Sequence, residues 1–391
     1  MIDEKMAIQT QTMNKPVMDK QSLIRQAIAC FNQNDPQQGK ALLQRAADAG
    51  SAAAVLYYAD ILFKEDKPSA YKYLGQQWQR GVKGTLHRRA LLRCFFDKQN
   101  SYTNDELFSD LHEEAIDGDI QSIVALISVM QSADVSRYYC ALLQQFSPEL
   151  AQQLLHALYT VQEASVTSTE LSQAFSTGLQ GWQQFNCEKI NSDIGLVVAK
   201  AALTDIECRY MMLRFSSLLQ PSQIVDPVSG TAKQNPYRTG SMVAIVPEYL
   251  DWIALGIELK MSAFAGFARQ NGEVMNLIHY DVQQRYLPHF DAIVGDTSTL
   301  SSQLRNGGQR QLTVLAYLNT VSAGGETSFL KLGIKVPAQA GDMLMFRNID
   351  AAGKLLQASY HAGEPVQAGE KWLLSKWVRQ GVTDYGTFVY G

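Results

Sequence analysis

The spacing of apolar residues changes near residue 190, and this change limits the fold more than any other feature of the sequence. Upstream, apolar residues recur every three or four positions, and Gly and Pro are sparse. Downstream, short runs rich in β-branched and aromatic residues alternate with turns that contain glycine. Because helices and strands bury residues at different periods, the two patterns indicate separate domains. The sequence therefore predicts an α+β multidomain protein with a helical N-terminal region.

A short element that ends in glycine recurs in the helical half. RAADAG ends at Gly50, QWQRG at Gly81 and EEAIDG at Gly118, and each is followed by another apolar segment. A glycine between two helices indicates stacked helical hairpins. These units, most clearly the one around residues 46–50, resemble the short tetratricopeptide-like repeats of the SEL type, although an irregular helical bundle is an alternative. We therefore expect a solenoid-like helical repeat domain over residues 19–160, after a polar tail at 1–18.

The composition excludes several classes of protein. A chain of 391 residues suggests two or three domains, and a net charge of −4 does not favour nucleic-acid binding. The polar N-terminus lacks the order of a secretory signal, and charges interrupt the apolar stretch 242–268, which argues against a membrane span. Five separated cysteines without a CxxC pair predict free thiols. We expect a cytoplasmic protein without nucleic-acid or membrane partners, and its oligomeric state is left open.

The first candidate for chemistry is the pair His289 and Asp291, which lie two positions apart. Residues at this spacing on a strand point to the same side, so the imidazole and the carboxylate can reach one metal ion. His361 follows downstream and can complete a set of two His and one carboxylate. Such a set leaves open positions on iron for a bidentate 2-oxo acid and O2. A lone HxD would be weak support for a metal site.

Lys371 opens the apparent strand KWLLSKWVR, and the alternation of that strand puts Lys371, Leu373, Ser375 and Trp377 on one face. A lysine that points into an apolar interior needs an anionic partner. The distal carboxylate of a 2-oxo dicarboxylic acid would supply that partner. Thr313 and Tyr317 share one face of the apolar strand QLTVLAYLN, and both can donate a hydroxyl hydrogen bond to a carboxylate.

The order of these elements resembles the prolyl 4-hydroxylase branch of the Fe(II)/2-oxoglutarate dioxygenases over residues 195–391. The resemblance is carried by YDVQQRY, HFD, RQLTVLAYLN, GGETSF, GDMLMF and HAGEPVQAGEKW. It implies a double-stranded β-helix (jelly roll) with buttressing helices around 201–220 and 246–271. Residues 161–194 would then be a connecting segment. IVDPVSG…NPYRTGS resembles the family segment that covers the substrate.

The resemblance implies a role for each matching residue. His289, Asp291 and His361 would hold iron, and Lys371 would bind the distal carboxylate of 2-oxoglutarate. The positions expected to line the same co-substrate pocket are Tyr280, Thr313 and Tyr317, and those expected on the substrate side are Arg238 and Trp377. Two departures stand out: YDVQQRY lacks the family glycine of Y–x–x–G, and RTGS has Gly240 where the family has serine.

The activity implied is hydroxylation of a substrate C–H bond with Fe(II), 2-oxoglutarate and O2, with ascorbate as a further cofactor and succinate and CO2 as products. The substrate expected is a prolyl residue of a protein or peptide that the helical repeats dock. One alternative is a free amino acid or other small molecule, with the helical region used for oligomerisation or partner binding. A catalytically silent binding module is a third possibility, against which the intact triad and Lys371 argue.

Overall fold

The structure is a computed structural model, and it describes residues 19–98, 102–130, 133–155, 166–225, 232–234, 237–295 and 303–391. It divides into two compact units, Met1–Leu92 and Arg93–Gly391, which we treat separately. The expected polar tail, part of the expected connecting segment and part of the expected substrate-covering segment lie outside the described residues.

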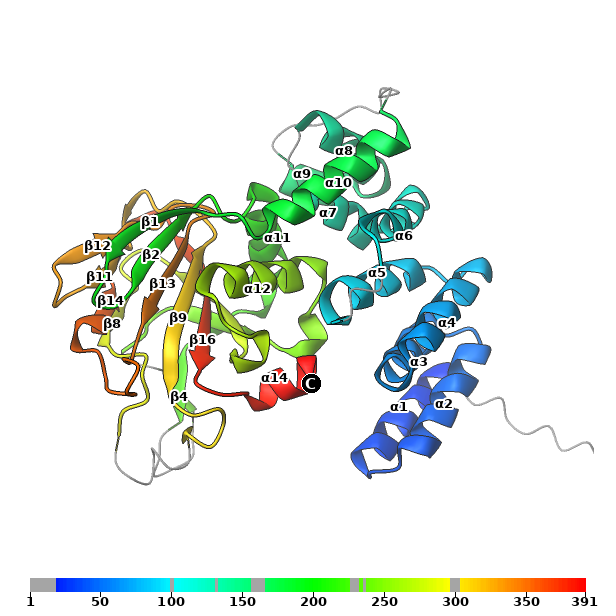
Figure 1. Cartoon of the computed structure of the whole chain (residues 1–391), viewed down its shortest axis with the longest axis horizontal. Coiled ribbons are helices and arrows are strands. Elements are labelled where there is room, and N and C mark those ends of the chain that lie inside the picture. Colours follow the sequence, from blue (N-terminus) through cyan, green and yellow to red (C-terminus); the bar gives the residue numbers. More distant parts are fainter. Residues whose placement is uncertain are drawn as a thin grey trace, which may run out of the picture. The chain divides into compact units, whose positions relative to one another are not determined.

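The first unit is built from consecutive helices, as its apolar spacing predicts (Figure 1). The helices of this unit are α1 (Lys20–Asn32), α2 (Pro36–Asp48), α3 (Ala52–Glu65) and α4 (Lys67–Gln79), and α5 (Thr85–Phe96) begins within it. Asp35 caps α2 by accepting a hydrogen bond from the backbone N–H of Gln38, and Pro36 fits the first helical position. Leu23, Leu43 and Val55 contribute to a shared core.

The recurring glycines end their helices in the same way. Gly50, Gly81 and Gly118 all have φ between 80° and 89°, which is the left-handed region that glycine tolerates. At Gly50, its N–H donates to Ala47 and the next N–H, from Ser51, donates to Ala46. The same pair of bonds recurs at the other two glycines, and this pattern is the Schellman motif. The sequence element is therefore a repeated helix C-cap.

The helices of the second unit precede and flank its sheets. They are α6 (Asn104–Ile116), α7 (Ile120–Val129), α8 (Ala133–Phe146), α9 (Pro148–Leu154), α10 (Ser168–Gly181), α11 (Asp205–Phe215), α12 (Trp252–Ala265) and α14 (Asp384–Tyr390). Two of these, α11 and α12, are the expected buttressing helices.

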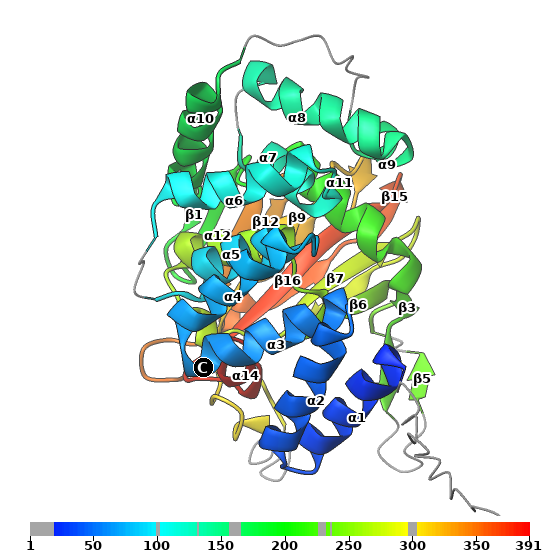
Figure 2. The same cartoon turned by 90° about the vertical axis from the view of Figure 1, so that its right-hand side faces the viewer.

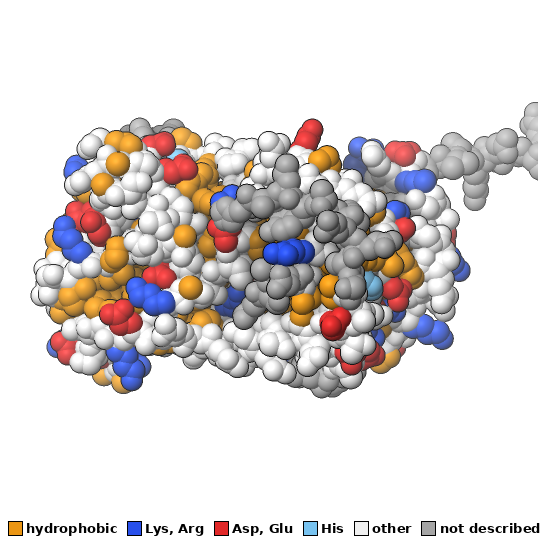
Figure 3. All heavy atoms as spheres, turned by 90° about the horizontal axis from the view of Figure 1, so that it is seen from above, with side chains coloured by type: hydrophobic (Ala, Val, Ile, Leu, Met, Phe, Trp, Pro, Cys, Tyr) orange, Lys and Arg blue, Asp and Glu red, His pale blue; other side chains and the backbone are white. Residues whose placement is uncertain are grey.

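Within the described residues, no helix is long and apolar enough to cross a membrane. Basic and acidic side chains are interspersed over the described part of the face in Figure 3.

Two antiparallel sheets form the jelly roll. The larger has the order β1-β2-β13-β9-β16-β7-β6-β3 and the smaller β12-β11-β14-β8. The strands are β1 (Asn186–Asn191), β2 (Leu196–Lys200), β3 (Gln220–Pro221), β6 (Ser241–Ile245), β7 (Met275–Tyr280), β8 (Tyr286–His289), β9 (Arg310–Tyr317), β11 (Thr327–Phe329), β12 (Ile334–Val336), β13 (Met343–Arg347), β14 (His361–Gly363) and β16 (Lys371–Arg379). Two small ladders, β4 (Gln223–Val225) with β5 (Ala232–Gln234) and β10 (Ala323–Gly324) with β15 (Val366–Ala368), lie outside them.

The core lies between the two sheets. Leu315, Leu344 and Leu373 from the larger sheet join Phe329 and Val336 from the smaller one in a single buried cluster. The sheet also begins earlier than expected. Residues 161–194, expected to connect two domains, contain helix α10 and strand β1, which pairs with β2. β1 is a polar edge strand, so it has no alternating apolar pattern that would have marked it.

A buried ion pair fastens α12 to the outer face of the larger sheet, where α11 and α12 lie (Figures 1 and 2). Lys376 on β16 pairs with Glu258 on α12, and neither side chain has any exposed surface. Tyr385 on α14 also donates to Glu258, at 3.2 Å. Because β16 alternates, Lys376 points away from the face that carries Lys371 and Trp377.

Lys376→Met is expected to lower the free energy of unfolding by about 3–5 kcal/mol, because Glu258 would remain buried without its partner. Denaturant titration followed by circular dichroism measures this loss. The double variant Lys376→Met/Glu258→Leu should recover most of it, since both charges of this pair are removed together. The control is Lys335→Met, which breaks a half-exposed pair with Glu364 and should change stability by less than about 1 kcal/mol. Equal losses of unfolding free energy in Lys376→Met and Lys335→Met would contradict the stabilising role of the buried pair.

Candidate active site

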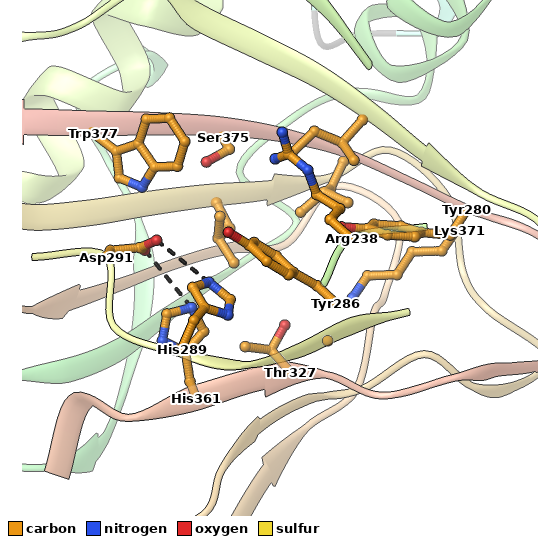
Figure 4. Close-up of a pocket in the computed structure, with 14 residues that line it drawn as sticks. Arg238, Tyr280, Tyr286, His289, Asp291, Thr327, His361, Lys371, Ser375 and Trp377 are labelled. Carbon is orange, nitrogen blue, oxygen red and sulfur yellow. Dashed lines mark ion pairs between the residues drawn. The ribbon is translucent and has the colours of Figure 1, made fainter. Parts of the chain in front are cut away.

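The two histidines and the aspartate predicted from spacing meet in the structure. His289 ends β8, Asp291 follows two positions later, and His361 begins β14. β8 and β14 pair antiparallel with His361 directly opposite His289. One ligand atom from each of the three side chains lies within 4.8 Å of the other two. The pairing of two short strands therefore builds a group that can hold a metal ion (Figure 4).

Both imidazoles are held in the form that a metal needs. His289 Nδ1 lies 2.8 Å from the carbonyl oxygen of Leu287, and His361 Nδ1 lies 2.9 Å from that of Ser359. A carbonyl oxygen only accepts, so each Nδ1 carries a proton, and in the neutral imidazole Nε2 is then the nitrogen with the lone pair for a metal. Burial also lowers the pKa of His361 to about 4, although the charge of Asp291 opposes this. The ring is therefore neutral at neutral pH.

Asp291 supplies the negative ligand. Its Oδ1 lies 3.5 Å from His289 Nε2, and its Oδ2 lies 3.7 Å from His361 Nε2. Burial alone would raise the pKa of Asp291, but the neighbouring imidazoles of His361 and His289 and the hydrogen bond from Thr313 hold it well below its usual range. Two imidazole nitrogens and one carboxylate on a single side are a donor set that fits Fe(II) and leaves room for further ligands.

The structure corrects the expected role of Thr313. Its hydroxyl was expected to donate to the co-substrate carboxylate. Instead, Thr313 Oγ1 lies 2.7 Å from Asp291 Oδ2 and donates its single proton there. The residue is 1% exposed and is not among those that line the pocket. Spacing indicated the correct face of β9 but could not distinguish a ligand from the neighbouring iron carboxylate as the acceptor.

Lys371 points into the same pocket as the triad, and the two lie on opposite sides of it (Figure 4). The side chains of β16 that line this pocket are the four that alternation predicted: Lys371, Leu373, Ser375 and Trp377. Lys371 is 3% exposed and forms no ion pair within the described part of the chain. Burial lowers its pKa to about 8, although the charge of Glu326 partly offsets this. A buried ammonium without an ion-pair partner fits an anionic ligand.

Hydroxyl groups surround the Lys371 side of the pocket. Tyr280 lies opposite Lys371 in the β7–β16 pairing and lines the pocket, and burial raises its pKa, so it remains a proton donor. Tyr317 was expected to line this pocket but is not among the residues that line it. Its hydroxyl is 2.7 Å from Thr327 Oγ1, and its ring is 5.5 Å from Lys371 Nζ. Thr327, the threonine of GGET, lines the pocket and was missed because that motif was interpreted only as a turn.

The two departures from the family pattern have physical explanations. Gln283 stands where the family has glycine in Y–x–x–G, and it still adopts φ 69°, so the turn after Tyr280 is kept. Gly240 stands where the family has serine. A Cβ atom there would lie 2.4 Å from the carbonyl oxygen of His279 and 2.6 Å from the Tyr280 ring. Glycine therefore lets this segment pack directly on Tyr280.

The expected substrate-side residues also line the pocket. Arg238, 8% exposed, lies with its guanidinium 5.3 Å from the centre of the Tyr286 ring. Tyr286 in turn stacks on His289 with 3.6 Å between ring centres. Trp377 packs against the guanidinium of Arg310 at 3.7 Å. Tyr286 was not assigned a role from the sequence, although it is the second tyrosine of YDVQQRY and precedes His289 on β8.

The affinity for 2-oxoglutarate is expected to fall as the pH rises above about 8. In the free protein, Lys371 loses its charge above its pKa of about 8, while the carboxylates of the ligand stay ionised throughout. The apparent Kd should then rise about tenfold per pH unit. Calorimetric titration of the protein with 2-oxoglutarate between pH 6.5 and 9.5 measures this. The Kd of Lys371→Arg for 2-oxoglutarate should stay constant over this pH range, because arginine stays charged. A Kd for 2-oxoglutarate that does not change with pH in the wild type would contradict the assignment of Lys371 as a buried lysine with no ion-pair partner.

Several known proteins are similar to part of this chain. Residues 275–379 match the family model of the 2OG-Fe(II) oxygenase superfamily. Prolyl 4-hydroxylase 5 of Arabidopsis thaliana is 32% identical over 209 residues, which cover 49% of this chain and 70% of the relative. Prolyl 4-hydroxylase 1 of the same organism is 32% identical over 202 residues, covering 48% and 70%.

Solved structures with weaker likeness were also found. A viral collagen prolyl hydroxylase from Paramecium Bursaria Chlorella virus-1, in complex with 2OG, is 24% identical and covers 49% of this chain and 94% of its own, with a TM-score of 0.36. A Pseudomonas putida prolyl-4-hydroxylase is 18% identical and covers 48% and 93%, with a TM-score of 0.34.

Membership of a family is shown by the relatives from Arabidopsis thaliana, because the matched region is much longer than a single motif. The donor set of the triad and the buried ammonium of Lys371 agree with it. The chain is therefore a dioxygenase that uses Fe(II), 2-oxoglutarate and O2, and it belongs to the prolyl 4-hydroxylase family of 2-oxoglutarate- and Fe(II)-dependent oxygenases.

Proposed function

We propose that this dioxygenase hydroxylates a prolyl residue of a protein or peptide and releases succinate and CO2. The main support for this reaction is that the triad and Lys371 line one pocket from opposite sides. The prolyl substrate is supported by the relatives described as prolyl 4-hydroxylases.

The residues of the pocket bind and orient the reactants. His289, Asp291 and His361 would hold Fe(II), and Lys371 would bind the distal carboxylate of 2-oxoglutarate, assisted by the Tyr280 hydroxyl. Iron, 2-oxoglutarate and O2 together supply the oxidising chemistry: one oxygen atom enters the substrate C–H bond, and the other enters succinate as CO2 is lost. Apolar side chains of the larger sheet line the same pocket and help exclude water: Ile278, Leu315 and Leu373.

Aromatic rings would position the substrate. Tyr286 and Trp377 line the pocket with Arg238, and each ring is held by a neighbour: His289 stacks on Tyr286, and Arg310 packs on Trp377. Rings that are held in place lose little conformational freedom when a ligand binds, and their faces suit the saturated ring of proline. These contacts place the substrate beside the triad without requiring a charged group on it.

Mass spectrometry of products tests this function. The full chain is incubated with Fe(II), 2-oxoglutarate, ascorbate as the reductant and either prolyl peptides or free proline. We expect a gain of one oxygen on a prolyl residue of the peptides, matched by an equal amount of succinate. His361→Ala should give neither product. Oxygen gained by free proline but not by peptides would contradict the proposal and favour the small-molecule alternative.

The proposal extends to the helical region and the compartment. Helical hairpins present extended surfaces, which suits a protein that carries the prolyl residue. A full-length protein substrate should therefore have a lower KM than a short peptide around the same proline. Equal KM values would leave the helical region without a docking role. All five cysteines are free, which suits the reducing cytoplasm.

A further inference from the structure

A short chain of hydrogen bonds leads from Asn348 to the aspartate of the triad. Asn348 follows directly after β13 and is fully buried. Its Nδ2 donates to Thr313 Oγ1 at 3.0 Å, and Thr313 Oγ1 donates to Asp291 Oδ2 at 2.7 Å. Thr313 is on β9, directly opposite Trp377 on β16. These two residues therefore link the core of the larger sheet to the iron-binding carboxylate.

The direction of this chain is fixed by chemistry. An amide N–H can only donate and an ionised carboxylate can only accept, so Thr313 must accept from Asn348 and give its one proton to Asp291. Rotation of the Thr313 hydroxyl would break the hydrogen bond to Asp291, so the hydroxyl is held in one orientation.

The arrangement leaves a buried polar atom of Asn348 unpaired. Within the described residues, Asn348 Oδ1 is buried and accepts no hydrogen bond. Turning the amide over would offer Oδ1 to Thr313, whose proton could then leave Asp291. The backbone N–H of Asn348 bonds to Gln311 O, and its carbonyl accepts from Leu356, so the residue is held on both sides. An unpaired buried oxygen is unfavourable, which suggests that the donor orientation is retained for the sake of Asp291.

We propose that Thr313 and Asn348 are positioning residues that fix Asp291 as a one-oxygen ligand of Fe(II). Thr313 occupies Oδ2 and leaves Oδ1, which faces His289 Nε2 at 3.5 Å, with its lone pairs available to the metal. Without this bond, the carboxylate can rotate and lose the orientation that matches the two imidazoles. The proposal rests on the iron site and is independent of which substrate is hydroxylated.

Metal affinity of the metal-free full-length chain tests the proposal without turnover. Co(II), whose visible absorption reports its coordination, is titrated into the wild type, Thr313→Val and Thr313→Ser. Removal of an outer group that orients a ligand typically weakens metal binding about 10–100-fold, and we expect this for Thr313→Val. Thr313→Ser keeps the hydroxyl and should bind within about threefold of the wild type. The Co(II) spectrum of Thr313→Val should also change shape, since the carboxylate is no longer held.

Thr383→Val is the matched control. Thr383 is equally buried, and its hydroxyl also donates and accepts, to Gly272 O at 2.7 Å and from Gly386 N at 2.8 Å, away from the triad. It should lose thermal stability but keep its Co(II) affinity. If Thr313→Val does not fold, Asn348→Leu tests the same chain of bonds, with about a 3–10-fold loss expected. Co(II) affinity near that of the wild type in Thr313→Val or, failing that, in Asn348→Leu would overturn the proposal. Equal losses in Thr313→Val and Thr383→Val would also overturn it.

Discussion

His361→Ala is expected to reduce 2-oxoglutarate turnover by more than about 100-fold, because it removes a direct ligand of the iron. Loss of a residue that only orients a ligand already costs about 10–100-fold, so loss of the ligand itself should exceed that range. Succinate released per enzyme, measured at saturating Fe(II) with a prolyl peptide, gives the effect. Titration of Co(II) into the metal-free variant should show the same loss as weakened binding.

His279→Ala is the control for this variant. His279 also lies on a strand of the jelly roll, but its Nε2 is 2.9 Å from Glu370 and its ring packs on Trp372 at 4.3 Å. We expect turnover within about threefold of the wild type, since this histidine touches no iron ligand. Iron-dependent turnover in His361→Ala within about tenfold of the wild type would show that the triad is not the iron site.

Lys371→Ala is expected to raise the Kd for 2-oxoglutarate by about 10–150-fold. The estimate corresponds to about 1.5–3 kcal/mol for a hydrogen bond to a charged group, at about 1.4 kcal/mol per factor of ten. Burial strengthens this contact, because Lys371 is 3% exposed and water cannot readily replace it. Calorimetric titration at pH 7 in the presence of Mn(II), without turnover, measures the change.

A second ligand separates loss of the charge from general damage to the pocket. 2-Oxopentanoate has the 2-oxo acid group of 2-oxoglutarate but no distal carboxylate. The wild type should prefer 2-oxoglutarate over it by about 10–150-fold, and Lys371→Ala should bind the two nearly equally. Lys335→Ala, which alters a half-exposed lysine of the same domain, should keep the preference. A preference that survives in Lys371→Ala would rule out Lys371 as the anchor of the distal carboxylate.

Much of the site could be predicted from the sequence because strands alternate. Period-two spacing placed Lys371 on the same face of β16 as Trp377. It also singled out His289 and Asp291 as a pair, although β8 ends at His289 and Asp291 lies just beyond the strand. Partners across the fold could not be obtained this way. Alternation assigned Thr313 to the correct face, but only the structure shows that its hydroxyl is used by Asp291. Lys376 lies on the other face of β16, and its burial depends on the packing of α12 against the sheet, which the alternation of one strand does not show.

The limits of the fold prediction have similar causes. The recurring glycines predicted the helix ends at Gly50, Gly81 and Gly118, because a positive φ has a strong residue preference. Gln283 adopts a positive φ without that signal, so the turn after Tyr280 could not be recognised from the residue type alone.

The most direct test of the account is the dependence of succinate formation on Fe(II) and O2 in the purified full-length chain. Succinate is measured from 2-oxoglutarate with and without each component, in the wild type, His361→Ala and His279→Ala. We predict succinate only when both Fe(II) and O2 are present, in the wild type and His279→Ala but not in His361→Ala. Succinate formation that persists in His361→Ala, or that is absent from the wild type at every Fe(II) concentration, would contradict an iron site at His289, Asp291 and His361.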